Sequence, residues 1–332
     1  MKNNVHLSFD QVRRCLSSLA SVSLIAGALA APAQADERAL FKPLPQDAGT
    51  PKHPVTPERI ALGKKLFNDT ILSQSKKISC NSCHTLSHFG VDNEPTSPGH
   101  DGHRGGRNSP SVYNAALHIA QFWDGRAADV EAQALGPILN PGEMAMPDEK
   151  AVVQRLTADK EYPQLFAKAF PREKQPLTFA NVGKAIGAFE RTLMTKSRFD
   201  DYLSGDDAAL TAEEKAGLKT FVAIGCGACH NGVTIGGGMY QKVGVVVPYP
   251  TSDEGRFGVT KNEADRFVFK VPSLRNSEKT APYFHDGGVK TLEEAVRFMG
   301  KHQLGRDLST EDTASIVTFL RSLTGKLPEN IE

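Results

Sequence analysis

Cys80-Asn81-Ser82-Cys83-His84 and Cys226-Gly227-Ala228-Cys229-His230 are two copies of one pattern, C-x-x-C-H, one in each half of the chain. On a helix, residues at i, i+3 and i+4 share a face, so the two thiols and the imidazole of each copy point the same way. This is the attachment signature of c-type haem, in which both thiols bond to the porphyrin and the imidazole reaches the iron. The pattern predicts two covalent haems, with His84 and His230 as proximal ligands.

A disulfide and half of a zinc site are the two plainer explanations of this pattern. A zinc ribbon needs a second C-x-x-C or a paired histidine nearby. Of the five cysteines, only Cys15 lies outside the two motifs, and it precedes an apolar run near the N-terminus. A C-x-x-C redox motif does not require a following histidine, and both copies have one. Haem attachment is therefore the favoured interpretation.

The N-terminus has the pattern of a secretory signal peptide. Lys2, Arg13 and Arg14 precede an apolar run, and Ala33-Gln34-Ala35 supplies a cleavage site. We expect residues 1–35 to be removed and the mature protein to lie in the periplasm, where c-type haem is attached; an uncleaved anchor is the alternative. No later run is long enough to span a bilayer. The net charge of +1 gives no indication of nucleic-acid binding.

Apolar periodicity and capping residues predict a mostly α fold. Helices are expected to follow Thr56, Thr211 and Thr291, and further helical patterns cover Ser111–Phe122, Asp129–Leu139, Asp148–Thr157, Tyr162–Phe170, Phe179–Met194 and Ser309–Leu323. Gly90–Pro110 is expected to be a long loop, and Gly232–Pro250 a small hairpin. The pattern of helix, haem motif, irregular segment and final helix occurs twice. It predicts two cytochrome c-like domains, residues 36–196 and 197–332, each around one haem.

The sixth ligand of each iron decides the chemistry, because His/Met ligation suits electron transfer and an open site suits peroxide. In the second half the methionines are Met239 and Met299, and the helical context favours Met299. Near the first haem the choice stays open among several side chains. These are Met144, Met146, His88, His100, His103 and His118.

Several further motifs are specific in combination. They are Pro98-Gly99-His100, Gln121-Phe122-Trp123-Asp124-Gly125-Arg126, Gln133, Pro141-Gly142-Glu143-Met144, Pro282-Tyr283-Phe284-His285-Asp286-Gly287 and Met299-Gly300. With the two C-x-x-C-H motifs, the chain resembles the bacterial di-haem cytochrome c peroxidases over essentially the whole length after residue 35. This resemblance implies reduction of hydrogen peroxide, with electrons from a small cytochrome c or a cupredoxin, by a protein that is commonly a homodimer.

The resemblance also implies roles for individual residues. His100 would be the displaceable distal ligand of the peroxidatic haem, and Glu143 the catalytic carboxylate with Gln133 beside it. Trp123 would lie between the haems, and Met299 would ligate the electron-transferring haem, with His285 near it. A calcium ion between the domains would be held by Asn108 and by the carbonyls of Thr280 and Pro282.

Two other functions remain as alternatives. A di-haem cytochrome without a substrate would carry electrons only, and it would have two permanently six-coordinate haems. A related branch modifies tryptophans on a partner protein and has tyrosine where this chain has Met299, which disfavours that branch.

Overall fold

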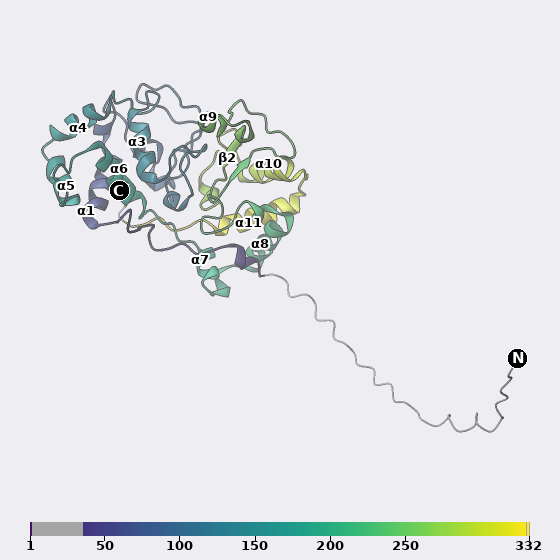
Figure 1. Cartoon of the computed structure of the whole chain (residues 1–332). Coiled ribbons are helices and arrows are strands. Elements are labelled where there is room, and N and C mark those ends of the chain that lie inside the picture. The colour runs from purple at the N-terminus through teal and green to yellow at the C-terminus, as the bar shows by residue number, and fades with distance from the viewer. Residues whose placement is uncertain (2–35, 330, 332) are drawn as a thin grey trace. The chain divides into compact units, whose positions relative to one another are not determined.

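The computed structural model describes Met1, residues 36–329 and Ile331, so the predicted signal segment lies outside the described residues except for Met1. The described chain is mostly helical (Figure 1). The α-helices and strands are α1 Pro57–Asn68, α2 Cys80–Cys83, α3 Val130–Leu139, α4 Glu149–Thr157, α5 Tyr162–Ala169, α6 Phe179–Glu190, α7 Arg198–Leu203, α8 Ala212–Ile224, β1 Tyr240–Lys242, α9 Phe257–Thr260, β2 Val268–Lys270, α10 Leu292–Leu304 and α11 Thr310–Ser322. None of the described helices is long and apolar enough to cross a membrane.

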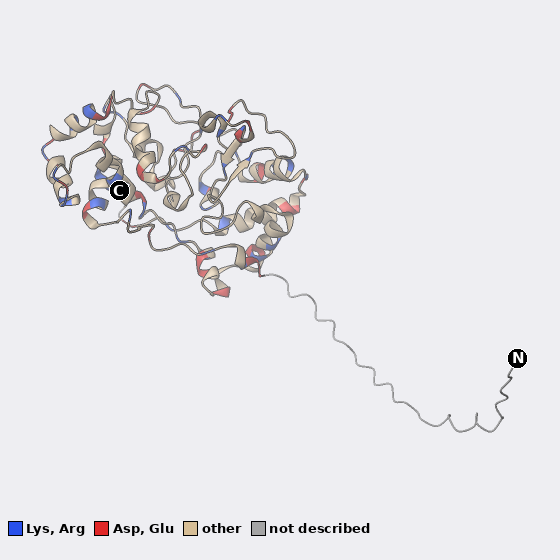
Figure 2. Cartoon of the chain, in the orientation of Figure 1, with Lys and Arg blue, Asp and Glu red and all other residues tan. Residues whose placement is uncertain are grey.

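The helix starts follow from local chemistry. Thr56 caps α1 with proline at its first position, and Thr211 and Thr291 form capping boxes with the glutamate three residues later. These side chains satisfy amide groups that have no partner inside the helix. Acidic residues also occupy the first turns of α7 and α8, where they complement the helix dipole (Figure 2).

The buried apolar residues of the described chain form two main clusters. The first is built from α1, α3, α4, α5 and α6. The second is built chiefly from α7, α8, α10 and α11. Phe41 of the N-terminal arm belongs to the second cluster, where its ring meets Phe199 edge-on at 5.4 Å. Leu327 and Ile331 pack against the first cluster. Phe41, near the start of the folded part, therefore packs in the cluster of the second half, and residues 327–331 pack against the cluster of the first half.

Both clusters contain a tight crossing between the helix that precedes a haem motif and a later helix. Gly63 of α1 lies against the carbonyl oxygen of Ala185 on α6, where an added Cβ would come within 1.9 Å. Gly217 of α8 lies against the carbonyl oxygen of Ser315 on α11, where the corresponding distance is 2.2 Å. A side chain at either position would separate the two backbones. The repeat seen in the sequence thus extends to the packing of these helix pairs.

The predicted helix over Ser111–Phe122 is wrong. Only Ala115–Leu117 forms a short 3₁₀ turn, and Asn114 and Phe122 have φ values of 62° and 66°. The amides of Asn114 and Ile119 donate to the carbonyl oxygens of Leu193 and Gly237. Hydrogen bonds to distant segments therefore replace the helical ones.

The predicted hairpin over Gly232–Pro250 is also wrong. β1 lies in that range, but its partner is β2, and the two strands run antiparallel with Tyr240 opposite Lys270. The helix expected over Phe179–Met194 ends at Glu190. The other predicted helices occur where the sequence places them, within a residue or two of the expected bounds. The short helices α7 and α9 were not predicted.

Candidate functional site

The first C-x-x-C-H motif forms one wall of a cavity, called the first cavity, which is lined by Cys80, Cys83 and His84. Ser79 and Ser82 form a capping box that starts the short helix α2 and so orients the two cysteines. The Nδ1 atom of His84 lies 3.4 Å from the carbonyl oxygen of Gly90. A proton on Nδ1 would leave Nε2 available as a ligand, which is how ligating histidines are usually held.

The second motif forms a wall of another cavity, called the second cavity, which is lined by Cys226, Cys229 and His230. Gly236 passes so close that an added Cβ would lie 3.2 Å from Nδ1 of His230. Burial lowers the pKa of His230 to about 4, although the nearby backbone carbonyls of Ile235 and Pro272 oppose this shift. The imidazole is therefore neutral at physiological pH, as an iron ligand must be.

The four cysteines of the two motifs carry free thiols. Burial raises the pKa of Cys80 to about 12 and that of Cys226 to about 11. Within the described part of the chain, neither motif brings its cysteines and histidine to a common point as a zinc site does. The donor sets fit two haems better than a disulfide or a zinc ion.

Glu143 and Gln133 line the first cavity together with His84. Glu143 lies in a turn over residues 141–144, and its carboxylate accepts a 2.7 Å hydrogen bond from the side-chain amide of Asn140. Burial raises the pKa of Glu143, while Asn140 and the charge of Arg126 oppose the rise. A carboxyl group with a raised pKa is suited to accepting and returning a proton. Asn140 was not singled out from the sequence, where it reads only as a turn residue.

His100 belongs to the loop that faces this turn. Its amide donates a 2.7 Å hydrogen bond to the carbonyl oxygen of Glu143. Gly99 packs so closely on Gly142 that an added Cβ would lie 2.2 Å from the carbonyl oxygen of Gly142. The His100 side chain is half-buried, and it is not among the residues that line the first cavity. The structure thus joins the loop to the Glu143 turn through the backbone.

The other candidates for the distal ligand of the first haem lie in several different places. The side chain of His103 is 87% exposed and pairs with Asp101 at 2.8 Å, and His88 is also exposed. Met144 and Met146 are buried in the first core cluster, and Met144 also lines the first cavity. His118 lines the second cavity instead of the first.

Met299 of α10 lines the second cavity with His230, and Met239 does not. His285 also lines this cavity. It is buried, its ring stacks on Phe269 at 4.3 Å, and its Nε2 lies 2.9 Å from the hydroxyl of Thr251.

Trp123 lines both cavities. Its indole N–H donates a 2.9 Å hydrogen bond to the carbonyl oxygen of Asn108, and its ring meets His285 edge-on with centroids 6.4 Å apart. The tryptophan therefore forms part of the wall that separates the two haem motifs.

Asn108, Thr280 and Pro282 all line the second cavity. The side-chain amide of Asn108 donates to the carbonyl oxygens of Glu94 and Pro95. Asn93 connects this loop to the second half of the chain, because its side-chain amide donates to the carbonyl oxygens of Lys279 and Ala281. The residues proposed for calcium are thus neighbours across the two halves, and Asn93 is a further link that the sequence did not indicate.

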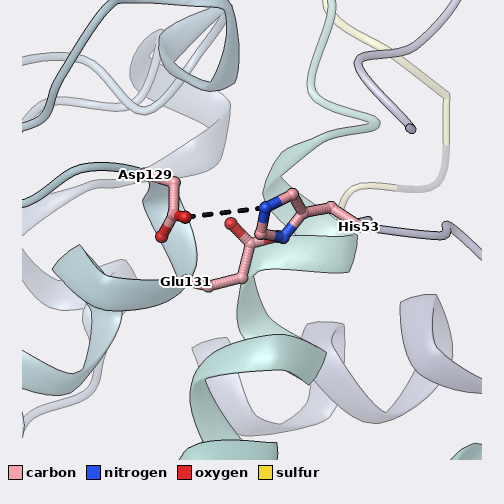
Figure 3. A group of neighbouring side chains, drawn as sticks. All are labelled: His53, Asp129 and Glu131. Atoms are coloured by element: carbon pink, nitrogen blue, oxygen red, sulfur yellow. Dashed lines mark ion pairs between the residues drawn. The ribbon is translucent and has the colours of Figure 1, made fainter. Parts of the chain in front are cut away.

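His53, Asp129 and Glu131 form a separate cluster of possible metal ligands (Figure 3). The ring nitrogens of His53 lie 3.6 Å from Asp129 and 3.1 Å from Glu131. However, both carboxylate oxygens of Glu131 already accept hydrogen bonds from Arg191, at 2.7 and 2.8 Å. The cluster is a partly buried ion-pair network that connects His53, in the segment before α1, to the start of α3 and the end of α6.

Comparison with known proteins agrees with this arrangement. Residues 57–208 match the family model described as di-haem cytochrome c peroxidase. The chain is 48% identical over 297 residues to cytochrome c551 peroxidase of Pseudomonas aeruginosa, covering 87% of this chain and 86% of that protein. It is 49% identical over 282 residues to cytochrome c551 peroxidase of Nitrosomonas europaea, covering 83% of each. Among solved structures, it is similar to a MauG-like protein associated with microbial copper homeostasis, with a TM-score of 0.76, 30% identity, and coverage of 87% of this chain and 94% of that one.

Proposed function

The chain belongs to the di-haem cytochrome c peroxidase family, and from this premise we propose that it reduces hydrogen peroxide to water in the periplasm with two covalently attached c-type haems. The observation that carries the proposal is that the two cavities are lined by different candidate functional residues. Glu143 and Gln133 share a cavity with His84, Met299 shares one with His230, and Trp123 lines both.

The thiols of Cys80, Cys83, Cys226 and Cys229 would hold the haems, with His84 and His230 as proximal ligands. When bound, the haems supply iron that binds peroxide and stores electrons. The overall reaction consumes one peroxide, two electrons and two protons and yields two water molecules. The residues of the chain must therefore provide a proton path on one side and an electron path on the other.

Glu143 would provide the proton path. Its carboxylate would accept a proton from one oxygen of peroxide and return it to the other, which leaves as water. Asn140 holds the carboxylate in the cavity through the 2.7 Å hydrogen bond. Gln133, on α3, can hydrogen-bond to peroxide or to Glu143. His100 would occupy the distal position of the first haem in the resting protein and leave on activation.

Met299 and Trp123 would serve the electron path. A thioether ligand favours ferrous iron and so raises the potential of the second haem, which suits it to accept electrons from a small cytochrome c or a cupredoxin. Trp123, which lines both cavities, would lie between the two haems. Calcium at Asn108, Thr280 and Pro282 would link the segments that carry these groups, and the oxygen ligands suit that ion. We further propose a homodimer.

The test has two steps. Mass spectrometry of the denatured mature protein should give the polypeptide mass plus two haems, and bare polypeptide would refute the covalent sites. Peroxide turnover is then compared between fully oxidised and half-reduced protein, followed optically. Turnover in neither state, with both haems six-coordinate throughout, would support the electron-carrier alternative. Activity only with a protein partner would support the tryptophan-modifying alternative, against which Met299 argues.

A further inference from the structure

Lys270 is a buried cation in the wall of the second cavity, at the end of β2. Lys270 is only 6% exposed. Its backbone amide donates a 2.7 Å hydrogen bond to the carbonyl oxygen of Trp123. Burial alone lowers the pKa of Lys270 to about 8, so the amine is still mostly charged at neutral pH. No carboxylate of the described residues forms an ion pair with it, and a buried charge without a counter-charge is costly.

His118 is the neighbour of this amine. Its Nδ1 lies 3.4 Å from Nζ of Lys270. An ammonium group can only donate, so Nδ1 must accept and the ring proton lies on Nε2. That Nε2 is buried and has no hydrogen-bond partner. The ring packs directly on Gly237, where an added Cβ would come within 2.4 Å of Cδ2 of His118.

The rest of the cavity wall has the same charge sign. The described residues that line the second cavity include Lys242, Lys270 and Arg275 but no aspartate or glutamate. Arg275 already has a partner outside this wall, since it pairs with Asp200 at 2.8 Å. The first cavity differs, because its wall mixes arginines with the acidic residues Asp124, Glu143, Glu190, Asp253 and Glu254. The second cavity is therefore built to receive negative charge. Among the described residues of its wall, Lys270 has no counter-charge, and Nε2 of His118 has no hydrogen-bond acceptor.

We propose that Lys270 and His118 together bind a propionate carboxylate of the haem in the second cavity. This inference rests on the proposed function, which puts a haem there. A carboxylate can accept from both donors at once, and it supplies the charge that the buried amine lacks. The same lysine is joined to Trp123 through its backbone amide, so the haem edge and the tryptophan would be held by one residue of β2.

The binding pair has a measurable effect besides activity. A positive charge near the haem favours the reduced iron, so its loss lowers the reduction potential of the second haem. Lys270→Gln should lower that potential and shift the propionate bending bands in the resonance Raman spectrum. Lys270→Arg keeps the charge and should change both readouts much less. His118→Phe fills the slot against Gly237 but has no N–H, and it should shift the Raman bands with a smaller change in potential.

Lys219→Gln is the matched control, because Lys219 is an exposed lysine on α8. It removes the same charge from the protein and should leave the potential and the Raman bands unchanged. Haem content is checked first by mass spectrometry. A wild-type protein without the second haem overturns the proposed function itself. Two haems in every variant, with unchanged potential and bands in both Lys270→Gln and His118→Phe, overturn only the present inference.

An anion from solution is the other ligand that would satisfy Lys270 and His118. The potential of the wild-type protein is therefore titrated with chloride and with inorganic phosphate. A potential that does not change with either anion supports the propionate. A potential that falls with added anion in the wild type but not in Lys270→Gln overturns the propionate assignment in favour of a bound solution anion. If Lys270→Gln does not fold, Lys270→Arg and His118→Phe still decide the question through the Raman bands.

Discussion

The amide of His100 donates a 2.7 Å hydrogen bond to the carbonyl oxygen of Glu143. The proposed distal ligand and the proposed proton-transfer group are thus adjacent in space, although they lie in separate segments of the chain. Because Gly99 packs directly on Gly142 in the same contact, a movement of the loop that carries His100 disturbs the turn that carries Glu143. If His100 and Glu143 have the proposed roles, this contact couples activation to proton transfer.

Replacing Glu143 with glutamine should abolish most peroxide turnover. The amide keeps the size of the side chain and can still contact Asn140, but it cannot carry a proton between the two peroxide oxygens. Loss of such a group typically costs about 10²–10⁴-fold in rate. Turnover is measured at saturating donor, with the optical spectra of both haems as the control for intact sites. Turnover close to that of the wild type would remove Glu143 from the mechanism.

Replacing His100 with glycine should make the oxidised protein active without prior reduction, because the distal position of the first haem is then open. The matched control is His103→Gly, since the His103 side chain is 87% exposed and pairs with Asp101; it should behave like the wild type. Turnover of fully oxidised protein and electron paramagnetic resonance of the first haem are the measurements. If His100→Gly keeps a strong-field sixth ligand and still needs reduction, His103 becomes the next candidate.

Replacing Met299 with histidine should markedly lower the potential of the second haem, because the thioether favours ferrous iron more than an imidazole does. A redox titration followed optically gives the result. Met239→Leu is the control, because Met239 lies outside the wall of the second cavity. A titration that changes in the control and not in Met299→His would make Met239 the ligand.

The buried pair Asp200–Arg275 should make the protein sensitive to acid. Burial alone would raise the pKa of Asp200, but Arg275 and the amides of Ser197 and Leu44 lower it overall. A carboxyl with a lowered folded-state pKa contributes stability that is present above its ordinary pKa, near 3.8, and is lost as the pH falls below that value.

Asp200→Asn should destabilise the protein by about 3–5 kcal/mol near pH 7, because it leaves the Arg275 charge buried without a partner. It should also flatten the acid limb of the stability curve. Denaturant unfolding between pH 3 and 7 measures both effects, and the exposed pair Lys215–Asp207 provides a control in Asp207→Asn. An acid limb that is unchanged in Asp200→Asn would show that the pair does not set the acid sensitivity.

Glu190 should make the folded protein less stable as the pH rises. Burial at the end of α6 raises its pKa to about 8, Glu131 adds to the rise, and Arg191 opposes it. A carboxyl with a raised folded-state pKa contributes stability that is full below its unfolded value, near 4.5, and is lost as the pH rises through about 8. Glu190→Gln should remove this decline, which amounts to a few kcal/mol at roughly 1.4 kcal/mol per pKa unit. Unfolding curves from pH 4 to 9 that decline equally in both proteins would contradict the prediction.

The sequence by itself determined the features that depend on neighbours within one helical turn. The spacing of C-x-x-C-H and the caps at Thr56, Thr211 and Thr291 are all local, and the structure has the caps where they were predicted. Family membership also followed from short motifs, because their residues are contiguous in the chain. These signals are readable because the groups that interact are three or four residues apart.

The tertiary structure decided everything that depends on distant partners. Ser111–Phe122 has helical periodicity, yet its amides bind Leu193 and Gly237, and that competition is invisible to a local pattern. β1 pairs with β2 rather than within its own loop. His118 reads as a ligand candidate for the first haem but lines the second cavity beside Lys270, 152 residues away in sequence. The effect of a buried charge depends on the groups that surround it. Burial and surroundings are properties of the folded chain, so a local sequence pattern does not contain them.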